Sequence, residues 1–361
     1  MRFPMRTSRG GFLPDTYDVA HDLCFVVHDI LAQLLKSGEE GGFFRTTITF
    51  NDEADRVSFE QAEDIFDWLE ETQRLNDRTS ILTTTVFPAI LSDMLHCIYE
   101  ALESSRKAKL NVTYMLVRKP IQESLFLLET IVVNPNDFAA KLAVDPLKLR
   151  GEKAGGLDAH TRRIQQVLEK LGEEGRFSAE YIAQLRYNKS EEDRFDGICN
   201  LAMHLFTEHR AIRTTPLNIN FIFSGWDEKC TQWAYLYSRL PYLLIYTHCV
   251  VEHLCERIAP THPTYLNDMQ RRIAALAVLW REQMEPAYVA EPIDKLVSYN
   301  RDWLIGHCLS AGYPAPSESD FVKMAFTGAF PREGKMKVLL RNLRYRLRAA
   351  LNRRSARRVR Q

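Results

Sequence analysis

Two short runs of the sequence combine histidine and glutamate at a spacing that suits a metal ion. His204 and Glu208 stand four residues apart, as do His248 and Glu252. Residues at i and i+4 share one face of a helix, so two imidazoles and two carboxylates could converge if the two helices pack antiparallel. This predicts a divalent metal held in a helical bundle. The competing interpretation, which we prefer, is polar pairs on helix flanks together with one satisfied core histidine.

A second pattern places an arginine and a histidine on one late helix. Arg301 and Asp302 open the segment, and His307 closes it. The segment resembles the R-x4-6-H motif of HEPN-type helical proteins. That resemblance implies metal-independent cleavage of RNA at a dimer interface, with Arg301 stabilising phosphate charge, His307 moving a proton and Asp302 as the polar residue after the arginine. The structural alternative is a helix with Trp303 and Leu304 buried and Arg301 paired with a nearby acid.

The third pattern is a strongly basic C-terminus. Residues 332–361 contain twelve Lys or Arg and one acid, Glu333, while the whole chain has a net charge of zero. The segment therefore carries +11 and the rest of the chain −11. Leucines follow one face of the predicted helix, at positions 340, 343, 347 and 351. The basic side chains we expect to contact a polyanion are Arg341, Arg344, Arg348, Arg353, Arg354, Arg357 and Arg358.

Two alternatives compete with nucleic-acid binding by this basic segment. An amphipathic basic helix is also typical of proteins that lie on an anionic membrane surface. In a self-docked arrangement the leucines would instead pack on the bundle, and the arginines would face acids such as Asp64, Asp67, Glu70 and Glu71.

The elements that must position these residues are predicted to be helices. Apolar residues recur at a spacing of three to four along most of the chain, which is typical of amphipathic helices. Ser58 to Gln61 has the form of a capping box and predicts an acidic helix from there to about Leu75. Further helices are expected near 15–38, 87–105, from Pro120, and at 157–171, 178–187, 191–210, 226–258, 264–284, 291–310, 318–328 and from about 333.

The fold class predicted from these patterns is all-α. Only residues 46–50 and 217–223 alternate as strands do, so at most a short β-ribbon is expected within an irregular multi-helix bundle, which could form two lobes. A glycine-rich stretch after residue 150 suggests an N-terminal helical region at 1–150, a C-terminal bundle at 157–331 and a basic amphipathic helix with a frayed tail at 332–361.

Several function classes lack their sequence motifs. The chain has no P-loop, no G-x-G-x-x-G and no H-E-x-x-H. Its seven cysteines form no C-x-x-C, and no secretory signal or membrane span is evident, which favours the cytoplasm. The leading hypothesis is a helical binding or regulatory protein that contacts RNA or DNA through its basic C-terminus. The HEPN-like ribonuclease is the alternative, the metal-binding bundle is the third, and a homodimer fits the leucine faces.

Overall fold

The computed structural model describes residues 11–151, 154–188, 193–203, 224–341, 343 and 344. Within these ranges the labelled α-helices are α1 (Asp18–Gly41), α2 (Glu53–Gln61), α3 (Ile65–Glu71), α4 (Leu75–Arg106), α5 (Leu110–Lys119), α6 (Leu125–Val133), α7 (Pro135–Val144), α8 (Leu157–Leu171), α9 (Ala179–Tyr187), α10 (Phe195–Met203), α11 (Trp226–Ile258), α12 (Pro263–Glu282), α13 (Glu291–Ser310) and α14 (Glu318–Thr327). Residues 335–341 and 343–344 are also helical and are called the C-terminal helix below.

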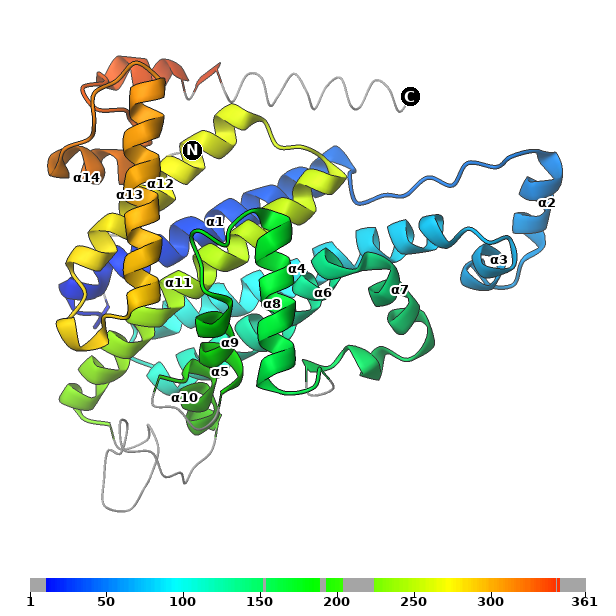
Figure 1. Cartoon of the computed structure of the whole chain (residues 1–361), viewed down its shortest axis with the longest axis horizontal. Coiled ribbons are helices and arrows are strands. Elements are labelled where there is room, and N and C mark those ends of the chain that lie inside the picture. The colour runs from blue at the N-terminus through cyan, green and yellow to red at the C-terminus, as the bar shows by residue number, and fades with distance from the viewer. Residues whose placement is uncertain (1–10, 152–153, 189–192, 204–223, 342, 345–361) are drawn as a thin grey trace.

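The predicted all-α class is confirmed, and α11 lies at the centre of the bundle (Figure 1). Every residue of α11 from Gln232 to Val251 is buried, because α1, α5, α6 and α8 pack around it. A helix covered on all sides needs apolar or well-paired side chains all round. This explains why its apolar residues form no single stripe in the sequence.

Local sequence patterns located most of the later helices. The expected bounds of α8, α11 and α13 agree with the structure at both ends, and those of α9, α12 and α14 agree to within two residues. One prediction was wrong. Ser58 does not start a helix but lies inside α2, which is capped instead by the Asp52 side chain accepting from the Asp55 amide. The acidic helix expected up to Leu75 is also broken, and Asp64 caps a separate α3.

The short β-ribbon that the sequence allowed at most does not form from the residues that the structure describes. Residues 46–50 belong to no strand. Residues 217–223 lie outside the described part of the chain. An extended segment needs a partner strand to satisfy its backbone groups, and residues 46–50 have none among the described segments.

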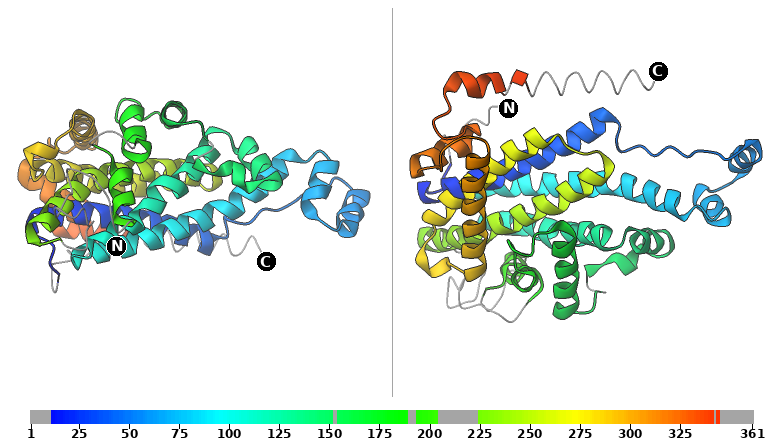
Figure 2. Two further views of the ribbon diagram at one scale, coloured as in Figure 1. Left: turned by 90° about the horizontal axis from the view of Figure 1, so that it is seen from below. Right: turned by 45° about the horizontal axis from the view of Figure 1, so that its top comes forward.

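Helices α2 and α3 project from one end of the molecule, far from the C-terminal helix at the other end (Figures 1 and 2). We call residues 51–77 the acidic arm, because they include ten acids and two arginines, a net charge of −8. A small aromatic cluster holds the arm together, with Phe59 and Trp68 ring centroids 5.1 Å apart. Arg74 strengthens it by donating to the Thr49 carbonyl at 2.8 Å and lying over the Trp68 ring. The arm therefore has its own small core.

Contacts between the first and second halves of the chain are extensive. Helix α1 packs against both α11 and α12, and a single cluster of buried side chains runs from Leu13 to Phe330. Among the described helices, α4 has the length and composition that could cross a membrane, with a mean hydropathy of 1.5 over 18 residues, of which 28% are buried. Its buried stripe packs on α1 and α5.

Candidate functional site

A cluster of buried charges lies where α12, α14 and the C-terminal helix meet. Asp268 is 2% exposed and accepts from two arginines of its own helix, Arg271 at 2.7 Å and Arg272 at 3.1 Å. The two guanidiniums also donate hydrogen bonds to backbone carbonyls at the end of α14. Arg271 donates to the Gly328 carbonyl at 3.2 Å, and Arg272 donates to the Phe326 carbonyl at 2.9 Å. One carboxylate thus positions two arginines that hold α14 against α12.

Gly328 is required at this point by its backbone and by its surroundings. It follows the last turn of α14 with φ of 63°, in the left-handed region where glycine carries no steric penalty. A β-carbon there would collide with the Asp268 carboxylate. Its carbonyl is free to accept because a helix end leaves such groups without helical partners.

The C-terminal helix is attached to this cluster by Arg341. Its guanidinium donates to the Glu333 carboxylate at 2.8 Å and to the Gly328 carbonyl at 2.7 Å, and it lies 3.5 Å from Asp268. Glu333 is 4% exposed and also accepts from the Phe330 amide at 2.9 Å. We call Asp268, Arg271, Arg272, Glu333 and Arg341 the C-terminal junction. Its charges are buried and paired, so they hold the base of the C-terminal helix in place.

Arg341 was expected to contact a polyanion, and here it is bound to the protein itself. Self-docking requires the leucines of the C-terminal helix to be buried, but those that the structure describes are exposed. Leu340 and Leu343 are 51% and 45% exposed. Arg344 is exposed as well. The acids named for self-docking lie on the distant arm, where Glu70 pairs with Arg78 at 3.3 Å. Residues Arg348, Arg353, Arg354, Arg357 and Arg358 lie outside the described residues.

The two residues of the HEPN-like motif make separate contacts on α13. Arg301 is exposed and pairs with Glu282 at 3.4 Å, as the structural alternative expected. Asp302 is exposed beside it. His307 stacks between Trp303 and Phe330, with centroid distances of 4.7 and 5.6 Å. Within the described residues Arg301 and His307 therefore contact different partners and not each other.

The histidine has a different arginine beside it. Arg271 approaches the His307 Nε2 at 3.0 Å, and because a guanidinium only donates, that nitrogen must accept. Burial and the charge of Arg271 lower the pKa of His307, which keeps the imidazole neutral. One signal of this arrangement is visible in the sequence: Asp268 is followed by arginines at i+3 and i+4, which lie on the same face of a helix.

Half of the predicted metal site lies outside the described residues, namely His204 and Glu208. The other half is present, with His248 Nδ1 3.7 Å from the Glu252 carboxylate on α11. Burial and the nearby Arg176 lower the pKa of His248 to about 3, while burial raises the pKa of Glu252 to about 7. In the described part of the chain no three His, Cys, Asp or Glu side chains gather as metal ligands would.

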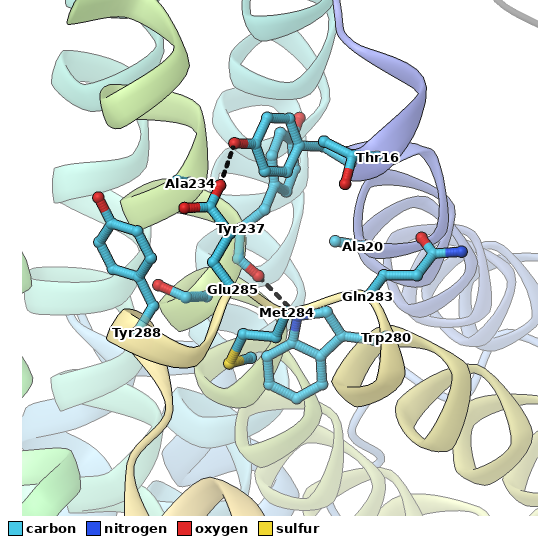
Figure 3. Close-up of a pocket in the computed structure, with 11 residues that line it drawn as sticks. Thr16, Ala20, Ala234, Tyr237, Trp280, Gln283, Met284, Glu285 and Tyr288 are labelled. Atoms are coloured by element: carbon cyan, nitrogen blue, oxygen red, sulfur yellow. Dashed lines mark hydrogen bonds between the residues drawn. The ribbon is translucent and has the colours of Figure 1, made fainter.

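A small cavity between α1, α11 and the end of α12 has a volume of about 20 Å³ (Figure 3). The Tyr17 hydroxyl donates to Glu285 at 3.0 Å across one wall, and the Trp280 indole donates to the Tyr237 carbonyl at 2.7 Å. Burial and Glu285 raise the pKa of Tyr17. These four polar groups are therefore already paired within the wall of the cavity.

A second buried ion cluster was also missed from the sequence. Glu129 and Arg186 are both fully buried and pair with each other, and Tyr246 donates to the same carboxylate at 2.8 Å. This cluster joins α6, α9 and α11 far along the chain, so no local pattern could reveal it. Its polar atoms face one another and not a cavity, which indicates a structural role.

No family model, no curated protein and no solved structure matches this chain.

Proposed function

We propose that this protein binds a polyanion, with RNA or DNA as the first class, through the basic segment at residues 332–361. The observation that supports this most is the state of its described basic side chains. Arg332, Lys335, Lys337 and Arg344 are all exposed, and none has an acidic partner among the described residues. Of the described basic side chains of the segment, Arg341 is the one that attaches the helix to the bundle. The charges of the other four are therefore available for a ligand.

The distribution of charge over the molecule favours the same proposal. The basic segment begins at the end of the molecule opposite the acidic arm (Figure 1). Phosphates approaching that end meet a positive potential and are not repelled by the arm, because salt screens charges over about 10 Å. Each phosphate neutralised by arginine or lysine releases counterions, so binding should fall steeply as salt rises. Tyr345 is the one aromatic residue after Phe330, so recognition of individual bases is not expected.

The test is binding of labelled single-stranded RNA and duplex DNA at several salt concentrations. A chain ending at Arg341 keeps the junction and loses eight arginines. We expect this truncation to weaken binding at least tenfold near 0.1 M salt and to flatten its salt dependence. Arg301→Gln serves as a control, since it removes one exposed arginine from α13. Equal affinity of the truncated and full chains would overturn the proposal.

The same preparation separates binding from the ribonuclease alternative. A protein that only binds leaves the RNA intact in excess EDTA, whereas a HEPN-like enzyme cleaves it and loses cleavage as His307→Ala. The contacts of Arg301 with Glu282 and of His307 with Arg271 give this alternative less support than the exposed basic helix gives to binding. Stoichiometric metal in the purified protein would instead favour the metal-binding bundle.

A further inference from the structure

One face of the C-terminal helix is apolar and uncovered. Met336, Leu339, Leu340 and Leu343 are 68%, 50%, 51% and 45% exposed, and we call them the apolar stripe. Their spacing of i, i+3, i+4 and i+7 places them on one side of the helix. At about 100° per residue, Arg341 points away from this stripe and into the junction. The attachment to the bundle therefore turns the apolar side outwards.

Exposed apolar stripes on a soluble surface usually mark an interface. A partner for this helix must supply apolar surface for the leucines and negative charge for the lysines and arginines beside them. Beyond Leu343 the sequence continues the apolar spacing with Leu347 and Leu351, and it continues the basic character with further arginines.

The acidic arm offers a surface with those two properties. A shallow open groove of about 550 Å³ runs between α2 and α3. Val57, which is 37% exposed, lines it together with Ala62 and the buried Trp68, and Glu53 and Glu71 also line it. Glu63, Asp67 and Glu71 are exposed and have no basic partner among the described residues. The arm carries −8 and the basic segment +11, so the two surfaces are complementary in both charge and polarity.

The arm that receives the apolar stripe must belong to another molecule. The C-terminal helix and the arm lie at opposite ends of the molecule in every view (Figures 1 and 2). Arg341 is tied to Asp268 and Glu333, so the stripe cannot leave its end of the bundle without breaking the junction. We propose that the C-terminal helix of one copy docks its apolar stripe in the α2–α3 groove of a second copy, with the arginines beside the acids of that arm.

This contact does not require polyanion binding, but the two use the same arginines and therefore compete. A docked C-terminal helix is unavailable to RNA or DNA, and a polyanion bound to it releases the arm. The contact joins two different surfaces, so two copies can exchange helices reciprocally, or copies can add head to tail.

The experiment measures the mass of the full chain by sedimentation at 50 mM and 500 mM salt, over protein concentrations up to about 100 μM. We expect association at low salt that weakens at least tenfold at high salt, because the charges are exposed and screened. The arm variant Glu63→Lys with Asp67→Lys and Glu71→Lys should be monomeric. Its control reverses the same number of exposed acids away from the arm, at Glu174, Glu180 and Glu256.

A second pair of variants tests the helix side of the contact. Leu339→Gln, Leu340→Gln and Leu343→Gln together keep every charge and should also abolish association, while Leu309→Gln, an equally exposed leucine on α13, should not. Reversing Lys335, Lys337 and Arg344, the exposed basic residues of the described helix, to Glu should separate the copies, and adding this change to the arm variant should restore the contact. That rescue is expected only if the two surfaces meet directly.

Three results would overturn the proposal. A wild-type chain that stays monomeric at low salt has no such contact. If association persists in the arm variant but is abolished in the triple leucine variant, the apolar stripes of two copies pair with each other. If the protein is a monomer that sediments with phosphatidylserine vesicles, and the triple leucine variant no longer does so, the partner of the apolar stripe is a bilayer. Binding of RNA is measured in parallel, and the arm variant should retain it, so failure of this contact is distinguishable from failure of the proposed function.

Discussion

In the C-terminal junction Asp268, Arg271 and Arg272 are each about 2% exposed, whereas in the acidic arm Glu63, Asp67 and Glu71 are exposed. Both regions are dense in charge, and in the sequence they look equally polar. Removing a buried partner leaves an uncompensated charge away from water, which is costly, while an exposed charge is already solvated. The comparison indicates that junction charges hold helices together and that arm charges are available for association.

The largest effect should come from Asp268→Ala. This change leaves Arg271 and Arg272 buried without their shared carboxylate and weakens the site of Arg341. We expect a loss of about 3–5 kcal/mol in the free energy of unfolding, measured by urea denaturation. Asp67→Ala in the arm removes the same group from an exposed position and should change it by less than about 0.5 kcal/mol. Similar losses in both variants would contradict the distinction between the two regions.

Arg341→Ala should have the next largest effect. It leaves the 4% exposed Glu333 without its guanidinium partner, so we expect a loss of about 2–3 kcal/mol. The C-terminal helix should also detach, which limited trypsin digestion would detect as faster cleavage after Lys335 and Lys337. Arg344→Ala, an exposed arginine one turn later, is the matched control and should leave both measurements unchanged.

A smaller effect is expected from Asp64→Ala in the arm. The Asp64 side chain accepts from the Phe66 amide at 2.6 Å and caps α3. Loss of such a cap costs about 1 kcal/mol. Because the arm has its own small core, hydrogen exchange should become faster in α2 and α3 and stay unchanged in α11. Faster exchange throughout the molecule would show that the arm and the bundle unfold together.

The smallest effect concerns pH and the imidazole next to the junction. The pKa of His307 is lowered by burial and by Arg271, so on acidification the unfolded chain takes up a proton before the folded chain does. Folding stability should therefore decrease as the pH falls below about 6.5, the ordinary histidine value. His307→Gln should show a weaker decrease between pH 7 and pH 5 in urea denaturation. An identical pH dependence in both proteins would mean that His307 does not contribute.

The sequence by itself determined the all-α class, the bounds of α8, α11 and α13, and the opposite charges of the arm and the C-terminus. These follow from local properties: a repeat of 3.6 residues, capping residues and charge counts along the chain. One local prediction was wrong: Ser58 was expected to cap a helix, but Asp52, six residues earlier, caps α2 instead.

Only the tertiary structure decided which charges are buried and which are free. Arg341 and Arg344 look alike in the sequence, yet Arg341 is bound by Glu333 and Asp268 and Arg344 lies in solvent. The exposure of Leu340 and Leu343 and the partner of His307 were equally undetermined. The energy of a charge or an apolar group depends on its surroundings, and here those surroundings come from residues far away in the sequence, such as Asp268 beside Arg341.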